Sequence, residues 1–263
     1  MMRTALGAAP TRLLLAPTAV VSGIYLLGLA TAELLLLTGG LVAGAAAHGI
    51  LVAVLLVHAI AAPRAPYRRL LIVLVLPSLI RLLGLTVPVA ATPVATWYLT
   101  AGTPALLAAI LAARLIGLPT GLLARPASLW LQLMIAISGV TNGLLAYLGL
   151  RPPALPGGPM SALVTAVAVT VFAAGLEELV FRGSLQFVAA ELFASPVAGI
   201  AVSTSVFALM YVGSLSVPFI VLMLATGLFL GWAVQQTGSL WGSIGAHAAM
   251  VIGLMVVWPL VLP

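Results

Sequence analysis

The sequence predicts an all-α, polytopic integral membrane protein with about eight or nine transmembrane helices. Of its 263 residues, 63% are hydrophobic and only 5% are charged, and the mean hydropathy is +1.31. Soluble globular domains do not have this composition. Spanning the hydrocarbon layer takes about 20 apolar residues per helix, and the apolar stretches leave almost no chain for a water-soluble domain. We therefore expect one membrane domain.

Polar, proline-rich or glycine-rich segments separate the apolar stretches. The clearest separators lie at 61–68, 118–126 and 151–159. The last of them divides an N-terminal group of transmembrane helices, residues 1–150, from a C-terminal group of core helices, residues 160–258. The predicted helices cover 13–37, 40–60, 70–89, 97–116, 128–149, 160–190, 196–212, 217–236 and 239–258.

Small residues recur at four-residue spacing in two of these helices. Gly227 and Gly231 form a GxxxG pattern in the eighth, and Gly40, Gly44 and His48 follow one another in the second. Such patterns let helix backbones approach closely. For His48 we favour close packing with a hydrogen-bonded imidazole. The alternative is a flat seat for a haem or chlorin with this histidine as axial ligand.

Charged residues are few. The only acids are Glu33, Glu177, Glu178 and Glu191, the ten basic residues are all arginines, and the net charge is +6. No basic run is long enough to follow a nucleic-acid backbone, so we expect membrane lipids and no nucleic acid as partners. Glu33 and Arg81 fall within or near the ends of predicted helices, where pairing or snorkelling is the default expectation.

The arginines also predict an orientation, because arginine accumulates in short cytoplasmic loops. We expect a multi-pass protein of a bacterial-type plasma membrane with a cytoplasmic N-terminus. In that orientation Arg151 lies outside. The cytoplasmic segments then contain Arg3, Arg12, Arg64, Arg68, Arg69 and Arg125.

The segment 175–186 places two adjacent carboxylates and an arginine inside an apolar helix. An ionisable residue at mid-membrane costs about 2.5 kcal/mol or more, so it is normally functional or paired. Glu178 and Arg182 share a helical face because they are four residues apart, whereas Glu177 is rotated by about 100°. The spacing predicts one carboxylate held by arginine and another that faces a cavity.

Three motifs follow one another in the C-terminal half: EELVFR at 177–182, FALMY at 207–211 and HAAMV at 247–251. In order and spacing they resemble the EExxxR, FxxxH and HxxxN or HxxxD motifs of the CAAX-protease and bacteriocin-processing (CPBP) family of intramembrane proteases. The resemblance covers about residues 160–255. It implies a CPBP-type helical core in this half of the chain.

The resemblance implies an endopeptidase in which the first glutamate and the second-motif histidine activate a water, with or without a metal ion, while third-motif residues stabilise the oxyanion. Two positions depart from the pattern. Tyr211 replaces the second-motif histidine, and Val251 replaces the asparagine or aspartate. Valine can neither donate nor accept a hydrogen bond. The family-derived catalytic residues Glu177, Glu178, Arg182 and His247 therefore form an incomplete site.

Two functions follow from these residues. The favoured one is a catalytically degenerate pseudoprotease without a cofactor, which acts as a binding or scaffold subunit for a membrane protein or membrane peptide. The alternative is an active intramembrane endopeptidase that uses water activated by Glu177, with zinc as its cofactor. A transporter or pigment-associated subunit is a further alternative. Counting residues from the turn after 190 places Glu177 level with Tyr211, and His247 near mid-membrane, so all three are expected to share one cavity.

The two arguments about the accessible side disagree. Known substrates of the CPBP family are cytosolic, which implies a site that opens to the cytosol. Glu177 and Arg151 are expected at the same end of the molecule. The arginine distribution places this end outside the cytoplasm.

Overall fold

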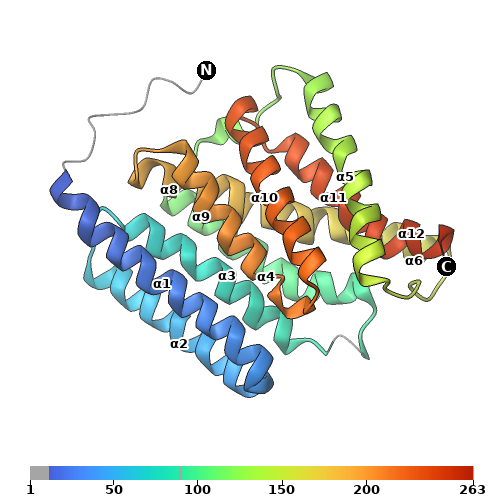
Figure 1. The fold of residues 1–263 in the computed structure, drawn as a ribbon, viewed down its shortest axis with the longest axis horizontal. Helices are drawn as coiled ribbons and strands as arrows, with labels where there is room; N and C mark the ends of the chain where they lie inside the picture. The colour runs from blue at the N-terminus through green and yellow to red at the C-terminus, as the bar shows by residue number, and fades with distance from the viewer. Residues whose placement is uncertain (1–11, 89–90, 263) are drawn as a thin grey trace.

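The computed structural model describes residues 12–88 and 91–262 (Figure 1). Within these residues all regular secondary structure is helical, and nine helices are long and apolar enough to cross a membrane. The predicted fold class is confirmed: the protein is an all-α, multi-pass integral membrane protein. The spans are Thr18–Thr38, Gly40–Ala61, Arg68–Thr86, Val94–Leu115, Leu129–Leu150, Pro159–Leu192, Pro196–Ser214, Val217–Thr237 and Trp241–Val261.

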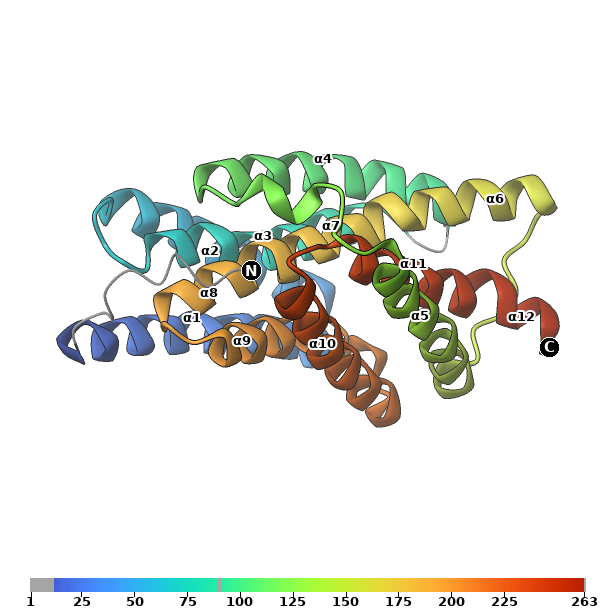
Figure 2. The ribbon, with the colours of Figure 1, turned by 90° about the horizontal axis from the view of Figure 1, so that it is seen from above.

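Four helices form the N-terminal half: α1 (Arg12–Thr38), α2 (Gly40–Ala61), α3 (Arg68–Thr86) and α4 (Val94–Leu115). Neighbours in the chain pack against each other, from α1 to α4 (Figure 2). A Cβ atom added at Gly44 would lie 2.5 Å from the Cα of Leu36. The predicted close packing is thus confirmed, and Leu36 occupies the small-residue surface that the haem alternative requires.

α5 (Leu129–Leu150) belongs to the N-terminal group by sequence but packs with the C-terminal helices, and it is therefore counted with the C-terminal half. That half further contains a long helix over Pro159–Leu192, α9 (Pro196–Leu209), α10 (Val217–Thr237) and α11 (Trp241–Ile252), which continues into a π-helical segment (Gly253–Val257) and α12 (Trp258–Val261). α5 packs along α11, where Gly139 meets the backbone of Ala246. The predicted close contact at the GxxxG pattern is confirmed, since a Cβ at Gly227 would lie 2.8 Å from the side chain of Thr204 on α9.

Two π-helical segments interrupt the α-helical hydrogen bonding of the long helix. The helix comprises α6 (Pro159–Ala168), α7 (Leu176–Glu178) and α8 (Gln186–Leu192), separated by π-helical segments at Val169–Gly175 and Leu179–Leu185. π-helical turns are rare and occur frequently at functional sites. Here they flank the two adjacent glutamates on both sides.

Serine caps begin the two helices that follow. The hydroxyl of Ser195 accepts a hydrogen bond from the backbone N–H of Ala198, and that of Ser216 accepts one from Phe219. Each satisfies a helix N-terminal donor that has no partner within the helix. The caps therefore define where α9 begins and where α10 begins after the turn that holds Tyr211.

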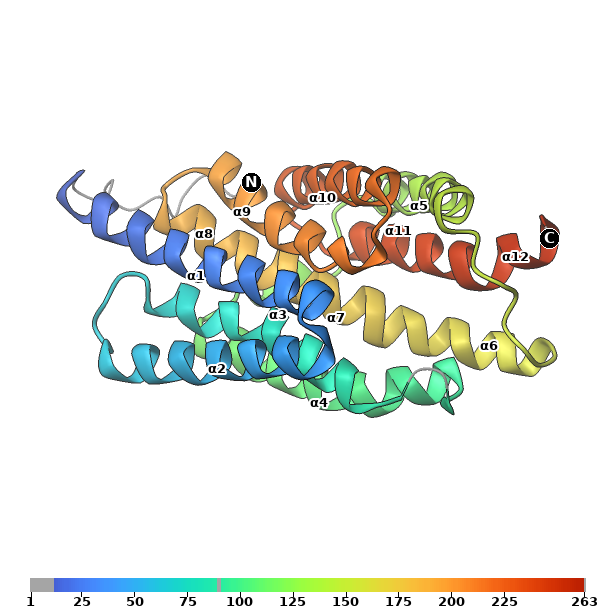
Figure 3. The same ribbon diagram turned by 60° about the horizontal axis from the view of Figure 1, so that its bottom comes forward.

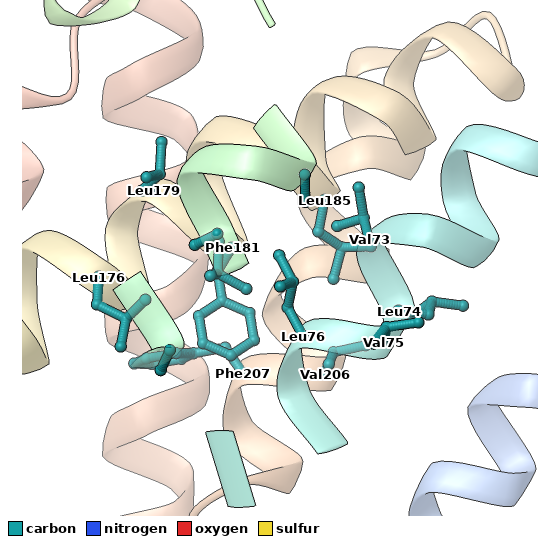
Figure 4. Close-up of a cluster of buried hydrophobic side chains, with 14 of the residues drawn as sticks. Val73, Leu74, Val75, Leu76, Leu176, Leu179, Phe181, Leu185, Val206 and Phe207 are labelled. Carbon is teal, nitrogen blue, oxygen red and sulfur yellow. The ribbon is translucent and has the colours of Figure 1, made fainter. Parts of the chain in front are cut away.

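The hydrophobic core lies where the two halves meet. Leu76 and its neighbours on α3 pack against Phe181 of the long helix and Phe207 of α9, and all three are buried (Figure 4). Long-range contacts of this kind join α3 to the long helix. The segment that carries the glutamates therefore lies between the N-terminal helices and the rest of the C-terminal half (Figure 3).

The connecting segments gather at two ends of the molecule. Arg69 binds the carboxylate of Glu191 and the carbonyl oxygen of Ile116, and the N–H of Leu240 donates to the carbonyl of Leu122. These contacts bring four connecting segments together at what we call the arginine-rich end, where Arg64, Arg68, Arg69, Arg114 and Arg125 lie. Arg151 lies at the opposite end, and Arg3 lies outside the described residues.

Candidate functional site

A cavity of about 410 Å³ lies between the N-terminal helices and the C-terminal half. Its wall is mainly apolar, and Glu177 is the only charged residue that the described part of the chain contributes to it. Leu150 and Pro152 line it at the end of α5, so the cavity lies towards the end opposite the arginine-rich end. Its aromatic wall is formed by Trp97, Tyr98, Phe172, Tyr211 and Phe219.

Glu177 faces this cavity and makes a single hydrogen bond. Its Oε2 atom accepts a bond of 2.9 Å from the hydroxyl of Tyr211. The side chain of Glu177 remains 21% exposed. The Nε2 atom of His247 lies 3.9 Å from the same oxygen, which is beyond hydrogen-bonding distance. Glu177 is therefore an accessible carboxylate with one phenolic donor.

Glu178 lies on the other side of the helix and is fully buried. Its Oε1 atom is 2.9 Å from Nη1 of Arg182 and 2.9 Å from Nδ1 of His247. Since a carboxylate only accepts hydrogen bonds, the network assigns a proton to Nδ1. Glu178 thus forms one ion pair and orients the imidazole.

The ring of Phe207 contacts the side chains of Arg182, His247 and Tyr211. The guanidinium of Arg182 lies over its ring, 4.1 Å from the centroid, at a distance typical of a cation–π interaction. The rings of His247 and Tyr211 meet Phe207 edge-on, with centroid distances of 5.8 and 5.1 Å. The phenylalanine of the FALMY segment therefore contacts side chains from all three motifs.

Comparison with known protein families shows which proteins the C-terminal half is similar to. Residues 159–253 match the family described as Type II CAAX prenyl endopeptidase Rce1-like. The predicted resemblance of the C-terminal half to CAAX-protease-like intramembrane proteases is confirmed. The match runs from the start of the long helix to the π-helical segment after α11. No curated protein and no solved structure matches the chain.

All of the family-derived positions lie in this Rce1-like segment, but only some of them face the cavity. Glu177 and both substituted positions, Tyr211 and Val251, line it. His247 does not: it is fully buried, and its Nε2 atom has no hydrogen-bond partner within residues 12–88 and 91–262. The expectation that His247 shares the cavity is therefore wrong, because its Nδ1–H bond to Glu178 turns the ring into the protein.

The donor set does not fit a zinc site. Zinc in a catalytic site takes three protein ligands and keeps a fourth position open. No group of three or more histidine, cysteine, aspartate or glutamate residues that could hold a metal ion occurs within residues 12–88 and 91–262. Glu177 Oε2 and His247 Nε2 lie 3.9 Å apart, and Tyr211 supplies a phenol whose hydroxyl donates a hydrogen bond to the glutamate.

Residues outside the Rce1-like segment also build the cavity. Ile80 of α3 and Trp97 and Tyr98 of α4 form part of its wall. Their role was not predicted from the sequence, because no motif connects them to residues 177–251. The adjacent aromatic pair at the start of α4 was the one available signal, and such pairs are also common at membrane interfaces.

Proposed function

We propose that the protein is an Rce1-like membrane subunit that binds the apolar segment of a membrane-associated peptide and does not hydrolyse it. One observation carries this proposal: the accessible carboxylate, Glu177, has a phenol as its partner where a second base would be needed. The family name, CAAX prenyl endopeptidase, suggests a peptide that carries a lipid.

Hydrolysis of a peptide bond requires a base that takes a proton from water and donors that stabilise the oxyanion. His247 is buried and engaged by Glu178, and Val251 adds only an apolar surface to the cavity. Among the described residues, the cavity wall therefore offers Glu177 as a base without the second-motif histidine beside it, and without the third-motif asparagine or aspartate to stabilise an oxyanion. We infer that the site is catalytically degenerate and that neither zinc nor another cofactor takes part.

Binding of a ligand requires a cavity of suitable size and polarity, but no base and no oxyanion donors. A mainly apolar cavity of this size with a few polar groups is typical of a ligand site. A hydrocarbon chain fits the wall formed by Phe172, Leu254 and Met255. Glu177 can then accept a hydrogen bond from a backbone N–H of the attached peptide, at the one exposed carboxylate of the cavity.

An active endopeptidase is the second candidate, and one observation favours it. The Nε2 atom of His247 is without a partner and lies 3.9 Å from Glu177 Oε2. If the ring were exposed by a small movement, a water could contact both groups. Glu177 would then act as the base, with His247 as the second polar group.

The test uses a lipidated peptide with a photoreactive lipid and the purified protein in nanodiscs. We expect crosslinking that unlabelled lipidated peptide competes away, weaker binding by Glu177→Gln, and no cleavage product in mass spectrometry. Glu191→Gln is the matched control, because Glu191 lies at the arginine-rich end. Cleavage that disappears in Glu177→Gln would establish the endopeptidase instead, and absence of specific crosslinking would refute the binding proposal.

Restoring the family residues tests the degeneracy directly. We expect cleavage by the double variant Tyr211→His, Val251→Asn at a rate that the unmodified protein does not reach, since loss of one oxyanion donor alone lowers rates by about 10²–10³. Equal rates for the two proteins would contradict the assignment of these two positions as the degenerate ones.

We propose further that the cavity opens away from the cytoplasm of a bacterial-type plasma membrane. The arginine-rich end is expected at the cytoplasmic face, and the cavity lies towards the other end. Gly213 and Gly121 lie at opposite ends, both are exposed, and an added Cβ meets nothing within 4 Å at either. In this cysteine-free chain, an impermeant maleimide should label Gly213→Cys and spare Gly121→Cys in intact cells. The reverse pattern would invert the orientation.

A further inference from the structure

A second buried ionic cluster lies in the N-terminal half, outside the Rce1-like segment. Glu33 of α1 is 1% exposed. It accepts two hydrogen bonds from Arg81 of α3, from Nε at 2.9 Å and from Nη2 at 3.0 Å. His48 of α2 is fully buried beside them, with Nε2 3.6 Å from the Glu33 carboxylate and Nδ1 3.2 Å from the hydroxyl of Ser78. The cluster therefore joins side chains from three helices, and Glu33 orients the guanidinium of Arg81 through two hydrogen bonds.

The same guanidinium reaches the candidate site. Arg81 Nη2 also donates to the carbonyl oxygen of Met210, at the C-terminal end of α9, where carbonyls lack a partner within the helix. A cation is favourable at this end of a helix dipole. The next residue is Tyr211, whose hydroxyl binds Glu177. The carbonyl group that Arg81 binds is thus part of the peptide bond between Met210 and Tyr211, and Tyr211 is the residue that contacts Glu177.

The turn after α9 packs against α1 and α10, but its own backbone hydrogen bonds are mostly local. Residues Val212–Ser214 form a single 3₁₀ turn, and Leu215 adopts a left-handed conformation with φ of 54°. The backbone hydrogen bonds of Ser214 and Leu215 are to residues within the turn. Arg81 is therefore a direct link between this turn and the N-terminal helices.

We propose that Arg81, oriented by Glu33, is a positioning residue for Tyr211. By holding the Met210 carbonyl it sets where the phenol meets Glu177, and so shapes the polar end of the cavity. The N-terminal half then has a defined role in the site, although it lies outside the matched family segment. The effect on ligand binding rests on the proposed function, whereas the effect on the turn does not.

Arg69 supplies a matched control. It binds a carboxylate, Glu191, and the carbonyl oxygen of Ile116 after the last turn of α4. This is the same chemistry as the Arg81 bridge, at the arginine-rich end and away from the cavity. Removing either arginine deletes one ion pair and one bond to a carbonyl at a helix end, but only one of them is linked to Tyr211.

The experiment places a spin label at Gly213→Cys, in the turn itself. We expect Arg81→Met to increase the mobility of the label in the electron paramagnetic resonance spectrum. Arg81→Lys should give an intermediate spectrum, because lysine keeps the charge without the paired donors. Arg69→Met should leave the spectrum unchanged. If Arg81→Met does not fold, Arg81→Lys carries the test, with the helical content of each variant checked by circular dichroism.

Binding of the lipidated peptide gives the second readout. We expect about tenfold weaker binding in Arg81→Met, equivalent to about 1.4 kcal/mol, and no change in Arg69→Met. A label at Gly213→Cys that is equally immobile in the Arg81 variants would overturn the positioning role, even if the peptide binds. A more mobile label in a protein that never binds the peptide would support the positioning role and refute only the proposed function.

Discussion

Glu177 and Glu178 are neighbours on one helix, yet their surroundings differ in every respect. Glu178 is fully buried and is held by Arg182 and His247. Glu177 is partly exposed to a cavity and has one phenolic partner. The difference arises from a rotation of about 100° between successive residues of a helix. Two adjacent carboxylates can thus serve as a structural anchor and as an accessible site.

The largest effect should follow from removal of the anchor. Glu178→Ala leaves Arg182 without its ion-pair partner in a buried site, and breaking a buried pair in this way typically costs about 3–5 kcal/mol. We expect a loss of that size in the free energy of unfolding, measured in mixed detergent micelles. Glu177→Ala is the control and should lose much less. Similar losses in the two variants would remove the distinction between the two glutamates.

A smaller loss of unfolding free energy is expected when residue 182 keeps its positive charge but loses the planar guanidinium. Arg182→Lys retains the charge beside Glu178 but loses the planar group over Phe207. A desolvated cation–π interaction is worth up to about 2 kcal/mol, so we expect a loss of roughly 1–2 kcal/mol by the same measurement. In a Phe207→Leu background, Arg182→Lys should lower the free energy of unfolding by much less. An undiminished loss would show that stacking does not contribute.

The smallest effect on stability should come from the partner of the accessible glutamate. Tyr211→Phe removes one hydrogen bond, which typically contributes about 0.5–1.5 kcal/mol, and water in the cavity can solvate the freed carboxylate. Tyr98→Phe is the control, because among the described residues that hydroxyl donates only to the sulfur of Met255, at 4.0 Å. We expect Tyr211→Phe to be slightly less stable than this control in parallel unfolding experiments. A loss as large as that of Glu178→Ala would mean that Glu177 is also a structural group.

The nine spans and the pairing of Glu178 with Arg182 were predictable because each depends on local rules. A membrane helix needs about 20 apolar residues, and residues four apart share a helical face. The observed spans agree with the predicted ones to within a few residues. The Rce1-like resemblance was also visible from three motifs in order, and the family match covers the same region.

The partners of the remaining charges depended on contacts between distant segments. Glu33 and Arg81 are 48 residues apart in the sequence, and Arg81 reaches the carbonyl of Met210 across 129 residues. Spacing along the chain cannot predict such pairs. Likewise, His247 has two glutamates within reach, and the folded structure pairs its Nδ1 atom with the buried one while its ring packs against Phe207.

The sequence by itself determined that the chain is a bundle of membrane helices with adjacent carboxylates in an Rce1-like segment, since hydropathy and helical periodicity act within single helices. Tertiary structure alone decided that a phenol is the partner of Glu177, that His247 binds Glu178, and that α3 and α4 complete the cavity wall. These features depend on how helices from both halves of the chain pack side by side, and a side chain's burial and partners exist only once that packing is formed.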